Sequence, residues 1–135
     1  MKVSFNAKPY RENEHDYLRI RSQVVVQNVM PGYPRREVMA LWDTGATNTY
    51  IPMELARRLE LSLGDDCNVS FSTADTPARF CRFNLRFPDG IISVTEGVAV
   101  PGLTDELIIG MDVMRHGHTT IEPDGEGGVR FTFSI

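Results

Sequence analysis

The chain has 135 residues, of which 41% are hydrophobic and 24% are charged, and its formal net charge is −4. This composition is typical of a globular protein, and the length suits one domain with a buried core, which we expect over residues 1–135. The mild acidity and the scattered Lys and Arg residues argue against a nucleic-acid partner. The sequence shows neither an apolar run long enough to span a bilayer nor an N-terminal signal segment, so we expect no membrane partner and a cytoplasmic location.

Strand patterns dominate the first part of the chain. After a short alternating stretch at the N-terminus, the polar residues 6–16 predict a loop. Apolar residues then predict strands over 17–27 and 37–42, on either side of a turn that contains two prolines and a glycine. Pro52 suits the first turn of a short helix, which we expect over Met53 to Leu61, with Leu63–Asp66 closing it.

Alternation with a period of two returns after this helix. It predicts strands over 81–87, 92–100 and 107–110, and a C-terminal hairpin over 119–135. Asp112 is placed to cap a short helix over 113–116. These elements predict a mostly β fold, a barrel or closed sandwich with one or two short helices.

Several polar residues favour structural roles. His116 and His118 form a pair without a third ligand nearby, so we expect no metal and no cofactor. A helix cap is preferred to a catalytic role for Asp112. Free thiols are preferred to a disulfide for Cys67 and Cys81, because two cysteines form no disulfide framework.

The segment Asp43-Thr44-Gly45 lies between two apolar stretches and carries the strongest chemical signal. Hydrolysis of a peptide bond needs a base that activates water and an acid that polarises the carbonyl group, and two carboxylates that share a proton supply both. Adjacent carboxylates cannot both ionise, so their titrations separate and belong to the pair. The chain holds a single Asp-Thr-Gly triplet, so this chemistry requires two copies of the chain with the site on a two-fold axis.

The neighbours of Asp43 fit this chemistry. Gly45 lets the backbone approach the carboxylate closely, and its N–H is then able to donate a hydrogen bond to it. The Thr44 hydroxyl is suited to lock the two loops across the two-fold axis, and Ala46 is small enough to leave room for a substrate backbone. Strand alternation points Trp42 away from the carboxylate and into the core.

With these motifs the chain resembles the retropepsin-like aspartic proteases, the retroviral-type enzymes and their single-domain cellular and bacterial relatives. The segment Ala40–Thr47 resembles the active-site loop of that family. Leu107–Met114 resembles its second hallmark, an apolar pair and a glycine followed by a short helix. The likeness covers about residues 17–135, and the N-terminal stretch matches least.

The resemblance implies a closed barrel with a flap hairpin, and a homodimeric aspartic endopeptidase that acts on extended peptides or unfolded proteins without a cofactor. Asp43 would be the catalytic residue of each protomer, Thr44 the clamp between the subunits, and Gly45 a contact for the substrate backbone. The strand Ile108-Ile109-Gly110 would thread behind the active-site loop and support it.

The resemblance also implies positions for the flap and the dimer interface. The flap would be a hairpin near Phe71 to Phe83, with Ala74-Asp75-Thr76-Pro77 near its tip. Terminal strands often build the interface in this family, and Val129 to Ile135 fits that role. Two departures keep an alternative open, a non-catalytic dimeric module that binds peptides: Thr47 replaces a common acidic residue, and the expected flap tip contains Pro77 and lacks glycine.

Overall fold

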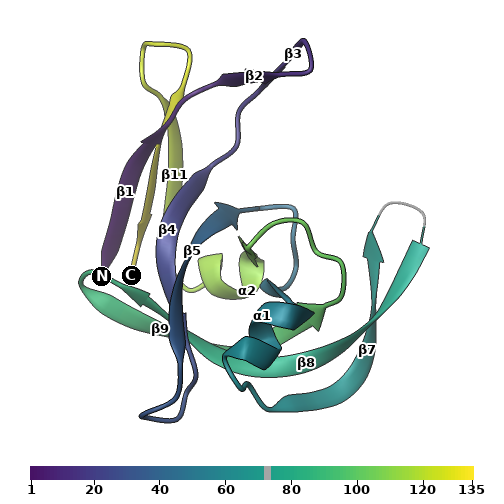
Figure 1. The fold of residues 1–135 in the computed structure, drawn as a ribbon. Helices are drawn as coiled ribbons and strands as arrows, with labels where there is room; N and C mark the ends of the chain where they lie inside the picture. The colour runs from purple at the N-terminus through teal and green to yellow at the C-terminus, as the bar shows by residue number, and fades with distance from the viewer. Residues whose placement is uncertain (72–73) are drawn as a thin grey trace.

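The computed structural model describes residues 1–71 and 74–135 and is drawn in Figure 1. Strands make up most of the described chain, and two short helices accompany them. In chain order the elements are β1 (Lys2–Ala7), β2 (Tyr10–Glu12), β3 (His15–Tyr17), β4 (Arg21–Gln27), β5 (Arg35–Trp42), β6 (Tyr50–Pro52), α1 (Met53–Arg58), β7 (Leu63–Phe71), β8 (Ala74–Phe87), β9 (Gly90–Val100), β10 (Leu107–Ile109), α2 (Met111–Met114), β11 (His118–Pro123) and β12 (Val129–Ser134).

The main sheet closes on itself. Its strands follow the order β4-β5-β10-β6-β9-β8-β7, and β4 also pairs with β8, which joins the two sides of the sheet into a ring. β10 is inserted between β5, to which it runs parallel, and β6, to which it runs antiparallel. The predicted fold class, a mostly β closed barrel with short helices, is confirmed.

The core fills this barrel through strand alternation. Val24 and Val26 of β4, and Ala40 and Trp42 of β5, point inward and are buried, while their sequence neighbours face out. The Trp42 ring lies 4.9 Å from that of Phe131, measured between centroids, and so connects the barrel to the C-terminal strand. The prediction that Trp42 belongs to the core is confirmed.

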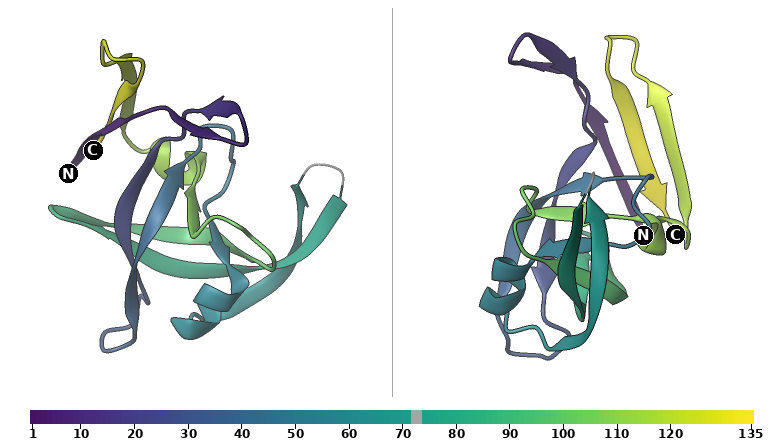
Figure 2. Two further views of the ribbon diagram at one scale, coloured as in Figure 1. Left: turned by 45° about the horizontal axis from the view of Figure 1, so that its top comes forward. Right: turned by 90° about the vertical axis from the view of Figure 1, so that its right-hand side faces the viewer.

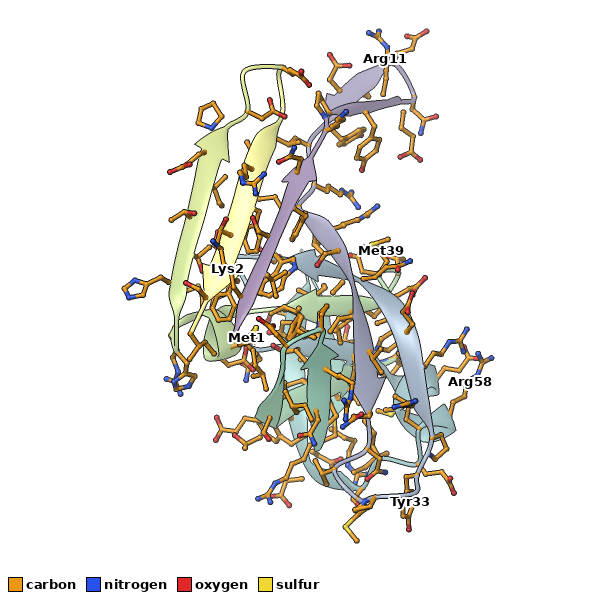
Figure 3. All side chains as sticks on the ribbon, turned by 90° about the vertical axis from the view of Figure 1, so that its left-hand side faces the viewer. Met1, Lys2, Arg11, Tyr33, Met39 and Arg58 are labelled. Carbon is orange, nitrogen blue, oxygen red and sulfur yellow. The ribbon has the colours of Figure 1, made fainter. Side chains whose placement is uncertain are left out.

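A second sheet is formed by the two ends of the chain. Its order is β1-β12-β11, and both pairings are antiparallel. One half of this terminal sheet packs on the barrel, and the other half projects beyond it together with the β2–β3 hairpin (Figures 1 and 2). Figure 3 shows Arg11 at the far end of that hairpin, with Tyr33 at the opposite end of the molecule.

Three boundaries differ from the sequence-based expectation. Residues 6–16 are not a loop, because they contain the end of β1 and the strands β2 and most of β3. Their turn is Asn13-Glu14, in which both residues have positive φ, as in the type I′ turns of tight hairpins. Leu63–Asp66 begin β7 instead of closing the helix, and α1 ends earlier than expected, at Arg58.

No helix in residues 1–71 and 74–135 is both long and apolar enough to cross a membrane.

Candidate active site

Asp43 leaves the end of β5 with its backbone and side chain both fixed. Its N–H donates to the carbonyl of Ile109 at 2.9 Å, and its own carbonyl accepts from the N–H of Ala46 at 3.1 Å. The Gly45 N–H donates to Oδ1 of the Asp43 carboxylate at 2.8 Å, the hydrogen bond expected from the sequence. The carboxylate is therefore held by its own loop, half-buried, before any ligand binds.

Some residues around Asp43 are closely packed, and others are exposed. A Cβ atom at Gly45 would lie 3.2 Å from Oδ1 of Asp43, so a larger residue would push against the carboxylate. Thr44 is exposed at the outer turn of the loop, and Ala46 is half-buried. Thr44 is thus accessible to a second molecule, which is what a clamp between subunits requires.

The strand β10 lies directly behind this loop. Ile108 pairs with Leu41 on one side and with Tyr50 on the other, and Ile109 is fully buried. Gly110 follows, and a Cβ atom there would overlap the carbonyl of Asn48 and lie 2.8 Å from the carbonyl oxygen of Ala46. Only glycine allows the two backbones to approach this closely. The structure thus brings Ile108, Ile109 and Gly110 together with the Asp43 loop.

A carboxylate that the sequence did not connect to the loop completes its support. Asp112 accepts hydrogen bonds from the Thr49 hydroxyl at 2.7 Å and from the Thr49 N–H at 3.0 Å. Thr49 is fully buried, and its hydroxyl oxygen accepts from the N–H of Gly110 at 3.2 Å. The expectation that Asp112 caps a helix is wrong, because α2 begins earlier, and its N-cap residue is Gly110. The pairing joins β6 to α2, and its residues lie too far apart in sequence for a local motif to reveal it.

β7 and β8 pair as an antiparallel hairpin in the region where the sequence predicts the flap. Asn68 to Phe71 of β7 pair with Pro77 to Ala74 of β8, so the four candidate flap residues Ala74, Asp75, Thr76 and Pro77 form the beginning of β8. The Ser70 hydroxyl donates to the Asp75 carboxylate at 2.6 Å across the hairpin. Residues 72 and 73 lie outside the described part of the chain.

Comparison with known proteins agrees with this geometry. A family model described as gag-polyprotein putative aspartyl protease matches residues 34–116, which is more than half of the chain and includes both the Asp43 loop and β10. The chain belongs to this aspartyl protease family. No curated protein matches the chain significantly.

Two solved structures show how far the likeness in fold extends. A retropepsin-like aspartic protease from Rickettsia conorii is 12% identical, has a TM-score of 0.64, and aligns over 98% of this chain and 92% of its own. The EIAV protease in complex with the inhibitor HBY-793 is 15% identical, has a TM-score of 0.56, and aligns over 73% of this chain and 86% of its own. The resemblance to retropepsin-like proteases is confirmed, and at these identities it concerns the fold.

In the aspartyl protease fold of this chain, a small apolar cluster, the flap cluster, joins the β7–β8 hairpin, where the flap is predicted, to β9. Val69, Ala78, Val98 and Val100 are buried there, and Tyr50, Cys67 and Leu103 pack against them. Burial raises the pKa of the Tyr50 hydroxyl, and the nearby Asp112 carboxylate raises it further, with smaller contributions from Cys67 and Asp43. A backbone hydrogen bond with Asn48 lowers this pKa and offsets part of the rise.

The cysteines and histidines show no second reactive centre in the described residues. Cys67 and Cys81 are free thiols, and burial raises the pKa of Cys81 to about 12. Within residues 1–71 and 74–135, no group of three or more His, Cys, Asp or Glu side chains is arranged to hold a metal ion.

The C-terminal strand, which the resemblance assigns to the dimer interface, is paired on both sides within its own chain. β12 is the middle strand of the terminal sheet, with β1 on one edge and β11 on the other. Its inward side chains Phe131 and Phe133 are fully buried in the core of the same chain. The residues from Val129 onward are therefore occupied by intramolecular pairs, and the outer edge of the C-terminal hairpin is β11.

Proposed function

We propose that this chain is a homodimeric aspartic endopeptidase in which Asp43 of each protomer activates a water molecule. The observation that supports it best is the fixed carboxylate: the Gly45 N–H holds Oδ1 of Asp43, and β10 holds the loop from behind. Membership of the aspartyl protease family gives the chemistry that this carboxylate would perform.

In the proposed reaction, one carboxylate of the pair is ionised and the other is protonated. The ionised group takes a proton from water as the oxygen attacks the peptide carbon, and the protonated group donates its proton to the carbonyl oxygen. When the tetrahedral intermediate collapses, the carboxyl group that took the proton from water donates it to the leaving nitrogen. The second carboxylate takes a proton from a hydroxyl of the intermediate, which restores the shared-proton state. No step requires a metal or an organic cofactor.

The partner protomer is required because the chain has one Asp-Thr-Gly loop. Two surfaces of the described chain suit the contact. Thr44 is exposed beside Asp43. Ile121 of β11 shares a sheet face with the buried Phe131, because the register aligns these two residues, yet 46% of Ile121 is exposed. An apolar side chain that extends past the core of its own chain is suited to packing against a second copy.

The substrate in this proposal is an extended peptide or an unfolded protein. It would lie between the flap hairpin and the strands that carry Asp43, with its backbone against Gly45. An extended chain suits a cleft between strands, because its side chains alternate and its backbone groups stay free to form hydrogen bonds.

The test is cleavage of an unfolded protein by the wild type and by Asp43→Asn at several pH values and enzyme concentrations. Asn retains an oxygen that accepts from the Gly45 N–H, so the fold should persist while cleavage falls by at least about 10³-fold. Activity of the wild type should rise faster than linearly with enzyme concentration near the dissociation constant of the dimer.

The variant also defines what would overturn the proposal. Cleavage that persists in Asp43→Asn would assign the activity to other residues. If neither protein cleaves any substrate while both are dimeric by light scattering, the alternative of a non-catalytic peptide-binding module would be favoured. Circular dichroism of both proteins controls for loss of folding.

A further inference from the structure

The register of four strands places a row of side chains beside the Asp43 loop. Arg21 of β4 aligns with Leu41 of β5, Leu41 with Ile108 of β10, and Ile108 with Tyr50 of β6. Residues aligned across neighbouring strands point to the same face of a sheet, so these side chains form one row. Trp42, which follows Leu41, points to the opposite face and is buried in the core.

This row lies at the level of the catalytic loop. Asp43 is two residues after Leu41, and its N–H binds the carbonyl of Ile109, the neighbour of Ile108. The Trp42 N–H donates to the carbonyl of Ile20 at 2.8 Å, which fixes the segment between Arg19 and Arg21 against the end of β5. A substrate bound at Asp43 would therefore pass over the row.

A hollow of about 340 Å³ lies beside the row and is lined by one of its members, Ile108. Ile108 and Val100 contribute its apolar lining, Thr76 reaches it from the flap strand, and Leu103 and Asp105 border it from the loop before β10. Its volume is at the low end of the range for ligand pockets, as expected of a subsite that takes a single side chain.

The edge of this hollow carries more positive than negative charge. Nη2 of Arg21 lies 3.4 Å and Nη1 of Arg19 lies 3.9 Å from the same oxygen, Oδ1 of Asp105. Two guanidinium groups thus share one carboxylate, although each carries five N–H donors. The side chains of Arg19 and Arg21 are 43% and 37% exposed and that of Asp105 is 22% exposed, so the cations are the more accessible partners.

The other charged groups nearby do not remove this excess of donors. The ring of Tyr17 lies under the Arg19 guanidinium, 5.8 Å from its central carbon, which orients the cation without supplying an anion. Glu106, the next acid of the loop, uses its carboxylate to accept from the N–H of Met39 at 3.0 Å. A carboxylate brought by a ligand would therefore meet two arginines at the edge of the hollow.

We propose that Arg19 and Arg21 bind an acidic side chain of the substrate, so that this protein prefers peptides with Glu or Asp close to the scissile bond. The inference rests on the proposed function, and it concerns the selection of substrates rather than the chemical step. The stem of the acidic residue would lie on Leu41 and Ile108, and its carboxylate would reach the guanidinium groups.

The first measurement compares peptides that differ only by Glu or Gln at one position, scanned over the residues on both sides of a cleaved bond. We expect kcat/KM of the wild type to favour Glu by about fivefold at one position, the upper end of the range for exposed ion pairs. The preference should appear in KM, and it should shrink at high salt because exposed charges are screened.

Three variants locate the preference. In the double variant Arg19→Gln, Arg21→Gln, the ratio of Glu to Gln should fall to about one, because neither peptide then meets a guanidinium group. Asp105→Asn removes the internal competitor and should raise the ratio about twofold. Arg35→Gln, at the opposite end of β5, is the matched control and should leave the ratio as in the wild type. Lysines at both positions should retain part of the preference, which excludes a purely structural effect.

Binding of the same peptides to Asp43→Asn, followed by fluorescence anisotropy, tests recognition without turnover. A Glu preference that disappears in the arginine double variant supports the inference even if the wild type cleaves nothing, in which case the proposed function alone fails. A preference that survives in the double variant, or no Glu preference in wild type and Asp43→Asn alike, overturns the inference and leaves the proposed function standing.

Discussion

The Asp43 loop and the terminal sheet differ in how completely one chain stabilises them. The loop is held from behind by its own chain, through Ile109, through Gly110 against its backbone and through the Asp112–Thr49 pair beyond. The terminal sheet packs half on the barrel, and its outer strand leaves Ile121 exposed. The proposed dimer would use both kinds of region, one that fixes the carboxylate before assembly and one whose exposed apolar surface is suited to a partner.

The largest expected effect concerns the Asp43 loop and comes from a substitution at Gly110. In Gly110→Ala, the new methyl group would overlap backbone atoms of Asn48, which cannot rotate away as a side chain could. We expect a loss of about 3 kcal/mol in the free energy of unfolding and a displaced Asp43 loop with little activity. Urea denaturation measures the first, and peptide cleavage measures the second.

The matched control for Gly110 is Gly64 in β7. A Cβ atom there would lie 3.4 Å from the carbonyl oxygen of Phe80, an ordinary contact, so Gly64→Ala should change stability by less than about 0.5 kcal/mol. Equal losses in the two variants would show that the tight packing behind the loop is not what stabilises it.

The next effect concerns the Asp112–Thr49 pair. Asp112→Ala would leave the buried hydroxyl and N–H of Thr49 without their acceptor, at a cost of about 2 kcal/mol. Asp112→Asn keeps one acceptor oxygen and should lose less. Thermal denaturation at neutral pH orders the three proteins, and an alanine variant as stable as the wild type would contradict the role of Asp112 in supporting the loop.

The strand elements were the most predictable part of the molecule, because alternation with a period of two reports burial directly. It located the strand before Asp43 and the C-terminal hairpin. It missed β2 and β3, because their polar residues bury little and their Asn13-Glu14 turn lacks the glycine that usually marks such hairpins.

The Asp43 loop and the strand behind it could also be predicted from local motifs, whereas the polar side-chain contacts around them could not. Asp43, Gly45 and Gly110 were recognisable from the residues around them. The contacts of Asp112 with Thr49, and of Asp105 with Arg21, join residues 63 and 84 positions apart, respectively. They follow from the register of the sheet, which a single sequence does not specify. The sequence shows the alternation of β1, but not its pairing with β12, which makes Val129–Ser134 an internal strand.

A substitution in the terminal sheet should have a smaller effect, which concerns the affinity of the proposed dimer. Ile121→Asp places a charge on the exposed apolar edge of β11 and should weaken the dimer about tenfold, equivalent to about 1.4 kcal/mol, with little change in the stability of the protomer. Thr120→Asp, on the polar face of the same strand, is the control. Sedimentation at several concentrations would show the difference, and an equal effect of both variants would exclude Ile121 as a specific contact.

The smallest effect is spectroscopic and tests the connection between Tyr50 and the loop. Burial, and next the Asp112 carboxylate, raise the pKa of Tyr50, so it should ionise at higher pH than a free tyrosine when followed by ultraviolet absorbance. The pKa of Tyr50 is higher in the folded than in the unfolded state, so the unfolded chain loses this proton first as the pH rises. The stability that Tyr50 contributes is therefore fully present below the unfolded pKa near 10, and it is lost as the pH rises through the folded pKa. In Asp112→Asn the Tyr50 pKa should move down, since a neutral amide no longer opposes the tyrosinate. An unchanged titration would mean that the Asp112 carboxylate does not act on Tyr50, and the coupling between the support of the loop and the flap cluster would have to be abandoned.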